Sequence, residues 1–215
     1  MNTDSRIGLA LATLLIGLTL LSFFYTPYPP DLMVTDEQFL APSFAHPLGT
    51  DSFGRDVLSR VMVGGRFTLL VAAVTVLGSA LVGGSIGICI GYISGQSALG
   101  SATSEVVMRV MDALSAFPGI LLALIMMAVL PTSNYTIIIA LLILFIPGYT
   151  RITRSSTLQY RNLDFVSMAQ VFGAGPLRII TRHILPNLGP ILLSALVIGL
   201  SNAILAEAAM SYLGL

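Results

Sequence analysis

The sequence predicts an all-α, polytopic membrane protein. Apolar residues make up 55% of the 215 residues, whereas charged residues make up only 9%. The mean hydropathy of +0.92 is strongly positive. The charged residues also cluster between long apolar runs instead of spreading over the chain. A run of about 20 apolar residues is long enough to cross a bilayer as a helix. The composition therefore places the chain in the membrane class.

Five apolar runs are candidate membrane spans. The first begins near the N-terminus and resembles a signal peptide, but it is longer than the usual ~7 to 15 apolar residues and no small-residue cleavage motif follows. We therefore expect it to be a retained anchor. The five expected spans run roughly over Ile7–Phe24, Phe67–Ile93, Val106–Leu130, Tyr135–Thr150 and Leu188–Tyr212.

These spans divide the chain into an N-terminal anchor at 1–24, an extracytoplasmic loop with an amphipathic helix at 25–65, and a transmembrane domain at 66–215. Arginine placement predicts the orientation, because short cytoplasmic loops are enriched in positive charge. A cytoplasmic N-terminus puts seven arginines inside and three outside, so we expect that orientation. The inner set is Arg6, Arg109, Arg151, Arg154, Arg161, Arg178 and Arg182, and the outer set is Arg55, Arg60 and Arg66.

The basic residues also exclude some functions. All ten are arginine. Without lysine the chain has no phosphate-binding loop of the G-x-x-x-x-G-K-[ST] type, so an associated ATPase must be another polypeptide. The net charge of zero argues against a nucleic-acid partner. The single Cys89 excludes an intrachain disulfide and is expected to be a packing residue.

Glycines recur every four residues along the second span, at Gly83, Gly87, Gly91 and Gly95, and Ser79 extends the row. Small residues at this spacing let another helix approach closely, because helices in lipid associate through van der Waals packing. We expect a packing seam, either within the subunit or against another one.

Charged residues inside the apolar runs are candidate functional sites by default. Arg109 and Asp112 lie three residues apart on one face of the third span, so a local ion pair is the simpler interpretation. Glu207 lies near the outer end of the last span, five residues after Asn202. Asp112 and Glu207 are therefore candidates for a pathway or gating role, with a structural role as the alternative.

The loop before the second span contains His46, Asp51 and Asp56, which are residue types found in metal and hydrolase sites. Their spacing fits no ligand motif, and we expect no metal site. The preferred interpretation is structural. Gly49 and Gly54 mark turns and Asp51 caps a backbone segment. An amphipathic helix then begins and leads into the second span.

A polar, arginine-bearing segment separates the last two spans. We expect Asp164 to cap a short helix that ends near Phe172, Gly173 and Gly175 to reverse the chain, and Pro176 to begin a second helix that ends at Pro186. Arg178 and Arg182 share one face of the second helix. The first helix exposes an apolar face suited to a groove on a protein: Phe165, Met168, Ala169 and Phe172. A helix lying in the lipid headgroups is the alternative.

The pattern Phe165-Val166-x-x-Ala169-x-x-x-Gly173-Ala174-x(3)-Arg178-x(4)-His183-Ile184-Leu185-Pro186-Asn187 resembles the EAA coupling loop of ABC importer permeases. From His46 onward the chain looks like the second permease subunit of the dipeptide, oligopeptide and nickel branch. Four further stretches carry the resemblance: His46–Asp51 with Gly54-Arg55-Asp56, Arg109–Asp112, Phe117-Pro118 and Ser211–Leu215.

The resemblance implies a permease that performs no chemistry itself and resides, multi-pass, in a bacterial inner membrane. Its partners would be a second permease subunit, ABC ATPase subunits and an extracytoplasmic solute-binding protein. The chain would bind no cofactor, and ATP and Mg would be used by the ATPase. The coupling loop at 160–187 would contact the ATPase through Phe165, Val166, Ser167, Met168, Ala169, Phe172, Gly173, Ala174, Arg178, Arg182, His183, Pro186 and Asn187.

Two departures from the family pattern stand out. Ser167 and Met168 replace the Glu-Ala that names the loop, and the chain stops at Leu215 where the family continues into a sixth span. We expect either a truncated version or a partner that supplies the missing part. Di- or oligopeptides are the expected substrate, with nickel or another small solute as the alternative. A membrane-anchored enzyme using His46, Asp51 and Asp56, and a non-transporting assembly protein, are the alternatives from other classes.

Overall fold

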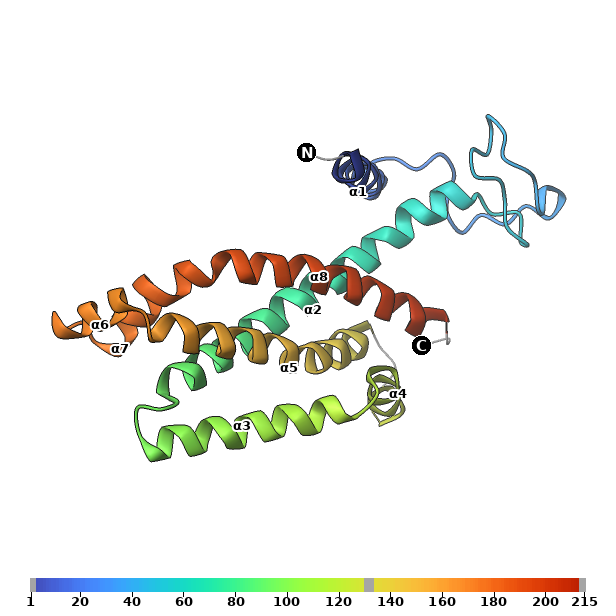
Figure 1. Ribbon diagram of the computed structural model, residues 1–215. Helices are drawn as coiled ribbons and strands as arrows, with labels where there is room; N and C mark the ends of the chain where they lie inside the picture. Colours follow the sequence, from blue (N-terminus) through green and yellow to red (C-terminus); the bar gives the residue numbers. More distant parts are fainter. Residues whose placement is uncertain (1–2, 130–133, 213–215) are drawn as a thin grey trace. The chain divides into compact units, whose positions relative to one another are not determined.

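The computed structural model describes residues 3–129 and 134–212. In these residues the regular structure is entirely helical (Figure 1). The chain forms two compact units, 1–70 and 71–215, and each is described by itself. The elements are α1 (Thr3–Ser22), η1 (Thr35–Glu37), α2 (Val57–Ile93), α3 (Ala98–Ala116), α4 (Gly119–Val129), α5 (Asn134–Arg161), α6 (Asp164–Val171), α7 (Pro176–Ile179), the π-helix η2 (Ile180–Ile184) and α8 (Leu185–Tyr212).

Four helical segments in the described part of the chain are long and apolar enough to cross a membrane: Thr3–Ser22, Val57–Ile93, Tyr135–Arg161 and Pro176–Tyr212. The prediction of an all-α, polytopic membrane protein is therefore confirmed. Each of the four extends beyond its predicted apolar run at one end, and the first ends two residues before the predicted Phe24. The amphipathic helix expected before the second span is the first part of α2, because no residue interrupts the helix between Val57 and Phe67.

The third predicted span is wrong as a single helix. The chain instead forms α3 and α4, with Phe117 between them in an extended conformation (φ −80°, ψ 131°). Pro118 is the cause, since its ring disfavours the helical conformation of the preceding residue and it has no N–H to donate. α3 also begins earlier than predicted, because the Ser97 side chain caps its N-terminus by accepting from the Gly100 N–H at 3.0 Å. The predicted end at Leu130 lies outside the described residues.

In the unit formed by 71–215, α5 contacts α3, α4 and α8 (Figure 1). One buried cluster joins three helices: Ala72 and Val76 of α2, Tyr149 of α5 and Ala203 of α8. The Tyr149 hydroxyl donates to the Ala195 carbonyl at 3.3 Å, so this buried polar group has a partner inside the core.

The predicted row of small residues lies against α5. A Cβ on Gly83 would lie 3.1 Å from the Thr150 hydroxyl, and one on Gly91 would lie 2.9 Å from the Arg154 carbonyl oxygen. Ser79 extends the row as a hydrogen-bond donor, 2.9 Å from the Leu142 carbonyl. The seam therefore lies within the subunit, between α2 and α5. Gly95 is not part of it, because that residue follows the end of α2.

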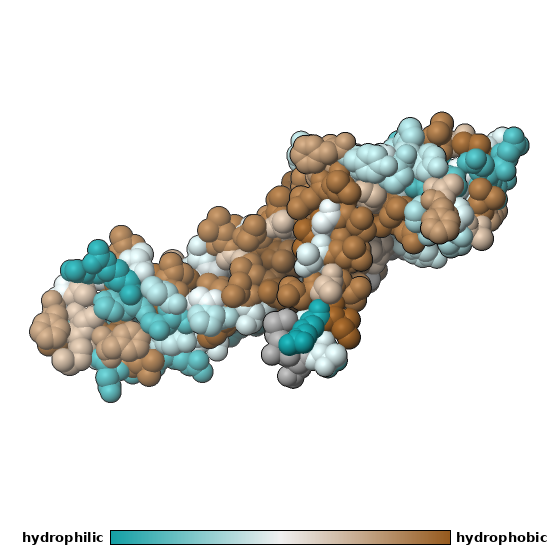
Figure 2. All heavy atoms as spheres, turned by 90° about the horizontal axis from the view of Figure 1, so that it is seen from above, coloured by the Kyte–Doolittle hydropathy of each residue, from teal (hydrophilic) through white to brown (hydrophobic). Residues whose placement is uncertain are grey.

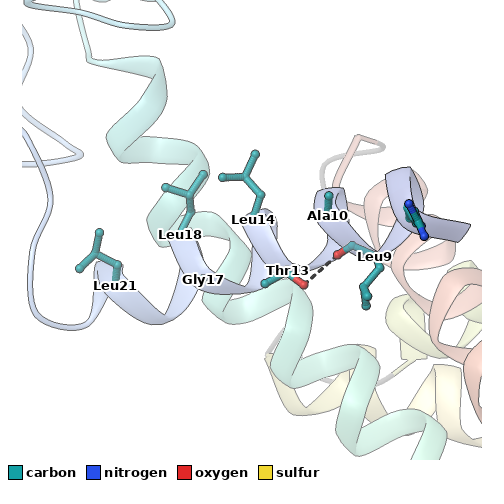
Figure 3. A pocket seen from close by; sticks show the side chains of 8 residues that line it. Leu9, Ala10, Thr13, Leu14, Gly17, Leu18 and Leu21 are labelled. Atoms are coloured by element: carbon teal, nitrogen blue, oxygen red, sulfur yellow. Dashed lines mark hydrogen bonds between the residues drawn. The ribbon is translucent and has the colours of Figure 1, made fainter. Parts of the chain in front are cut away.

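α1 belongs to the other unit and exposes most of its surface. A shallow apolar hollow runs along one of its faces (Figure 3). The side chains that line it recur at helical spacing, as on a helix that presents one face to hydrocarbon. They are Arg6, Leu9, Ala10, Thr13, Leu14, Gly17, Leu18 and Leu21.

Candidate functional site

The segment between the last two long helices is the candidate site, and its first part is a helix with a sharp end. α6 runs from Asp164 to Val171. The Gly173 N–H donates to the Gln170 carbonyl and the Ala174 N–H to the Ala169 carbonyl, both at 2.9 Å. This pair of bonds is a Schellman motif, which needs a left-handed residue, and Gly173 has φ +79°. The chain therefore reverses at the glycine that the sequence indicated.

The start of α6 differs from the prediction. Asp164 is the first residue of the helix and Leu163 occupies the capping position, with no side-chain capping bond. Leu163 belongs to the short turn between α5 and α6, because its backbone N–H bonds to the Tyr160 carbonyl at the end of α5. The helix α6 therefore begins directly after this turn, at Asp164. A carboxylate in the first turn still interacts favourably with the helix dipole. Gly175 is likewise not part of the reversal, because it precedes α7 as its capping residue with φ −72°.

One side of α6 is buried and another is open. Val166 is fully buried, at 0% exposure, in a cluster with Ile88 and Tyr92 of α2. Ile179, Ile184 and Leu188 complete the cluster. The exposed apolar side chains on the open side are Phe165, Met168 and Phe172, the last at 81%, and Val171, also exposed, lies about 100° from Phe172 around the helix axis. Ala169 lies between them and is half-buried. α6 is thus anchored through one valine while it presents an apolar face outward.

The second part of the segment is not the separate helix that was predicted. Pro176 begins α7 as expected, but Pro186 does not end the helix. The run from Pro176 to Tyr212 is continuous, through the π-helix η2. The wider π turn makes this possible, because the Leu185 N–H bonds five residues back, to the Ile180 carbonyl. Pro186 follows directly in this continuous run, where the wider turn accommodates the proline that lacks an N–H.

The helical run that follows the turn carries polar side chains, one of which, His183, lies near the exposed face of α6. Arg178 and Arg182 are both exposed. The His183 ring lies 6.4 Å from the Phe165 ring, centroid to centroid. The Asn187 side-chain amide donates to the His183 carbonyl at 2.6 Å. Figure 2 shows hydrophilic and hydrophobic side chains side by side at the end formed by α6 and α7, whereas hydrophobic side chains dominate over the long helices.

The charged pair predicted within the third span is replaced by a pair between helices. Asp112 of α3 accepts from Arg151 of α5 at 2.8 Å, and Arg151 also donates to Ser115 at 3.0 Å. The expected partner, Arg109, lies one turn away on the same helix. Packing of α3 on α5 brings a guanidinium directly to the Asp112 carboxylate, which favours the tertiary pair over the local one.

Glu207, the other candidate for a pathway or gating role, is buried in α8. Asn202, five residues before Glu207, is exposed. It borders a small apolar hollow between α5 and α8, which Tyr149 and Gly199 also line. The structure therefore separates the two candidates: Glu207 lies within the helix bundle, and Asp112 lies on an exposed surface.

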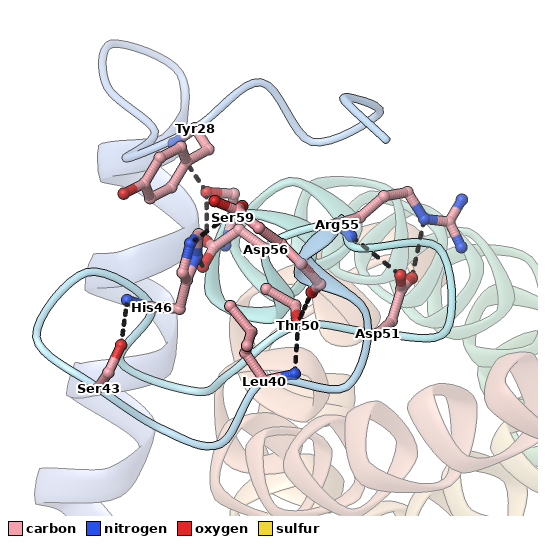
Figure 4. Close-up of polar contacts among 10 residues, drawn as sticks. Tyr28, Leu40, Ser43, His46, Thr50, Asp51, Arg55, Asp56 and Ser59 are labelled. Atoms are coloured by element: carbon pink, nitrogen blue, oxygen red, sulfur yellow. Dashed lines mark hydrogen bonds and ion pairs between the residues drawn. The ribbon is translucent and has the colours of Figure 1, made fainter. Parts of the chain in front are cut away.

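In the other unit, the residues that suggested an enzyme form a structural network (Figure 4). His46 and Asp56 are buried, with the His46 Nδ1 atom 3.0 Å from an Asp56 carboxylate oxygen. The Ser59 hydroxyl donates to the other Asp56 oxygen at 2.7 Å and accepts from the Tyr28 N–H at 3.1 Å. Ser59 therefore bonds to the carboxylate and not to the imidazole. A Ser-His-Asp triad places the imidazole between the hydroxyl and the carboxylate, so this order does not form such a triad.

The carboxylates of Asp51 and Asp56 are held in their charged form. Burial alone would raise the pKa of Asp56, but hydrogen bonds from Ser59 and His46 outweigh it and lower the pKa below its usual value. Desolvation likewise opposes ionisation of Asp51, yet the backbone N–H groups of Arg55 and Phe53 and the guanidinium groups of Arg55 and Arg60 hold its pKa well below the usual range. Within the described residues no three His, Cys, Asp or Glu side chains are grouped as metal ligands.

Two arginines that the sequence reasoning did not single out bind other helices near the candidate site. The Arg154 Nε atom donates to the Ser104 hydroxyl of α3 at 2.8 Å. Arg161 donates to carbonyl groups at the end of α2. No local signal distinguishes them from surface arginines, because their partners lie 50 or more residues away in the chain.

Comparison with known proteins agrees with this architecture. Residues 87–215 match the family model described as "binding-protein-dependent transport system inner membrane component". The chain is 40% identical over 210 residues to a provisionally named peptide transport system permease protein of Brucella suis, covering 98% of this chain and 69% of the relative.

Two further relatives have more specific names. The dipeptide transport system permease protein DppC of Haemophilus influenzae is 31% identical over 220 residues, covering 100% of this chain and 72% of the relative. The oligopeptide transport system permease protein OppC of Bacillus subtilis is 34% identical over 217 residues, covering 100% and 68%. These relatives are transport permeases and not enzymes. The chain therefore belongs to the family of inner membrane components of binding-protein-dependent transport systems, the permease subunits of ABC importers.

Proposed function

We propose that this permease subunit moves di- or oligopeptides and that α6, with the turn that follows it, is the surface on which an ATPase subunit docks. The observation that carries the proposal is the exposed apolar face of α6, formed by Phe165, Met168 and Phe172. The other side of the helix is held in place by Val166, which is fully buried. A short helix that presents apolar side chains suits a groove on a protein.

The surroundings of this face favour a protein partner over lipid alone. Arg178 and Arg182 are exposed on the continuous helix that follows the turn. Arginine forms paired hydrogen bonds with carboxylates and is enriched at protein interfaces. Exposed apolar side chains and exposed arginines within one segment have the composition of a protein interface. ATP and Mg would be bound by the docked subunit, and this chain would contribute the docking surface.

The docking proposal is tested with one charge placed on opposite sides of α6. Phe172→Asp puts a carboxylate on the exposed apolar face. Gln170→Asp puts the same carboxylate on an exposed position about 160° away around the helix axis. We expect Phe172→Asp to abolish copurification of the ATPase subunits and Gln170→Asp to retain it, with equal amounts of both variants in the membrane. Retention of the ATPase by both variants would contradict the proposal.

The peptide substrate is supported by the names of the relatives, which include dipeptide and oligopeptide systems. Uptake by the reconstituted complex, together with its binding protein, separates peptides from the nickel alternative. We expect a labelled dipeptide or oligopeptide to accumulate in an ATP-dependent way. ATP-dependent accumulation of nickel without peptide uptake would overturn the assignment.

We also propose that the N-terminus and α6 face the cytoplasm of a bacterial cell and that the loop between α1 and α2 faces outward. Arginine placement supports this orientation. Cysteines at Ala45 and Ser167 report on it in a Cys89→Ser background, since Cys89 is exposed. Ala45 is preferred to Ser43, whose hydroxyl accepts from the His46 N–H. An impermeant thiol reagent on intact cells should label Ala45→Cys and not Ser167→Cys, and equal labelling would reject this topology.

A further inference from the structure

Arg161, the last residue of α5, binds the C-terminal end of α2. One of its terminal nitrogens donates to the carbonyl oxygens of Gly91, Tyr92 and Ser94, at 3.4 Å and 3.0 Å for the first two. The last four carbonyls of a helix have no partner within it and carry partial negative charge. A guanidinium group, planar and always charged, suits several such acceptors at once.

The turn after α2 is shaped around this guanidinium. Gly95 has φ +80°, and a Cβ there would lie 3.2 Å from the other terminal nitrogen of Arg161. On its other side, the Gly95 N–H donates to the Ser101 hydroxyl of α3 at 3.0 Å. The turn that joins α2 to α3 is therefore fixed both to α5 and to the first turns of α3.

Arg161 also lies close in sequence to the proposed docking helix. Only Asn162 and Leu163 separate it from the start of α6 at Asp164. On the far side of that start, Val166 packs into the buried cluster that contains Tyr92 of α2. The beginning of α6 is thus joined to the end of α2 twice, by a charged hydrogen-bond network at Arg161 and by apolar contact at Val166.

We propose that Arg161 is a positioning residue that makes the α2–α3 turn move together with α6. This inference rests on the proposed docking of an ATPase on α6 and adds the connection by which that docking reaches α2 and α3. When the ATPase displaces α6, the guanidinium carries the end of α2 with it. Without the guanidinium, α6 still docks and the ATPase still hydrolyses ATP. The ends of α2 and α3 then move less when α6 moves, so less substrate is transported per ATP hydrolysed.

The test uses the full complex reconstituted in liposomes with its ATPase subunits and binding protein. Arg161→Met keeps the length of the side chain and removes its donors, whereas Arg161→Lys keeps the charge and loses the planar fork. Arg109→Met on α3 is the control, since it removes an exposed arginine, whereas Arg161 is half-buried by its contacts with the end of α2. The measured quantity is substrate taken up per ATP hydrolysed, together with the amount of copurified ATPase.

We expect all three variants to copurify with the ATPase. Uptake per ATP should fall by about tenfold in Arg161→Met, the change in population that corresponds to one lost charge-assisted hydrogen bond. Arg161→Lys should fall in between, and Arg109→Met should equal the unmodified complex. An unchanged ratio in Arg161→Met would overturn the inference and leave the docking proposal intact. If Arg161→Met fails to accumulate in the membrane, Arg161→Lys decides, because an unchanged ratio in that variant overturns the inference equally.

Failure of the ATPase to dock on α6 and loss of the Arg161 connection give different experimental results. The Phe172→Asp variant tests whether α6 is the docking surface at all, and its readout is the presence of the ATPase and not the ratio of uptake to hydrolysis. A complex in which Phe172→Asp retains the ATPase therefore refutes the proposed function. If Phe172→Asp loses the ATPase as expected while Arg161→Met keeps the unmodified ratio of uptake to ATP hydrolysis, only the role of Arg161 is refuted.

Discussion

An alanine at Gly87 should push α2 away from α5, whereas an alanine at Gly84, on the same helix, should not. A Cβ on Gly87 would press against the carbonyl oxygen of Thr150 and the hydroxyl of Thr153 and would lie 2.9 Å from the Arg154 backbone nitrogen. Two of these three atoms belong to the α5 backbone, which cannot rotate away as a side chain can. At Gly84 the Cβ would meet only the Thr153 methyl group at 3.7 Å, an ordinary contact.

The two substitutions therefore differ in a single energetic term. Replacing glycine by alanine inside a helix gains up to about 1 kcal/mol at either position, because alanine loses less backbone entropy. Overpacking a fitted interface costs about 1 to 3 kcal/mol, and only Gly87→Ala incurs it. We expect Gly84→Ala to be neutral or stabilising and Gly87→Ala to be less stable than Gly84→Ala by about 1 to 3 kcal/mol.

Thermal unfolding of the purified complex in detergent measures this difference. For a chain of this size, about 1 kcal/mol shifts the midpoint by roughly 2 to 4 °C, so the two variants should differ by roughly 2 to 12 °C. The paired design removes the common effect of losing a glycine. Equal midpoints would show that α2 does not press against α5 at this seam, and the close approach of the two helices would have to be rejected.

Three further outcomes follow from the contacts described. Gly173 has φ +79° and open space around it, so Gly173→Val should strain the turn by roughly 1 to 3 kcal/mol and reduce copurification of the ATPase. Gly173→Asn should be tolerated, because asparagine adopts left-handed conformations more readily than valine. Asp112→Arg and Arg151→Asp should each lower the yield of purified complex, and the double variant should recover it; no recovery would mean that the pair is not a contact. The folded-state pKa values of Asp51 and Asp56 are depressed, so their stabilisation of the α1–α2 loop is present above the unfolded value of about 4 and is lost as pH falls through the folded values. The hydrogen-exchange protection factors of this loop, corrected for the intrinsic pH dependence of exchange, should be constant from about pH 5 to 8 and fall below about pH 4.

The long helices could be predicted from sequence because a membrane leaves the backbone little choice. Every N–H and C=O group in hydrocarbon needs a partner within the segment, so an apolar run of sufficient length forms a helix. The ends of the helices were less predictable. α2 begins ten residues before the predicted apolar run, and α5 continues eleven residues past it, to Arg161. Polar residues extend a helix as readily as apolar ones once the rest of it is formed.

Proline shows where the sequence was ambiguous. Pro118 divides a predicted span in two, whereas Pro147, Pro186 and Pro190 lie inside continuous helical runs. In a packed bundle, neighbouring groups and local π turns satisfy the carbonyls that a proline leaves without a donor. Which outcome occurs depends on these neighbours, and the local sequence does not contain them.

The candidate site was predictable to the extent that it is local. Gly173 and the exposed face of α6 follow from residue types and helical spacing. The partner of Asp112 did not follow, since Arg151 lies 39 residues away and a local partner offered a simpler alternative. The role of Arg161 was missed for the same reason. Tertiary contacts of this kind depend on which helices pack together, and periodicity along one helix carries no information about that.

The unbroken helix from Pro176 to Tyr212 has a geometric consequence. From Leu185 onward, α8 has 28 residues, a length of about 42 Å at the usual rise per residue. A change of about 10° in the direction of the helix at η2 would displace its far end by about 7 Å, given that length. A stiff rod pivoted near one end amplifies motion in this way. A small angular adjustment in the π turn would therefore move the far end of α8 by about the width of an amino-acid side chain.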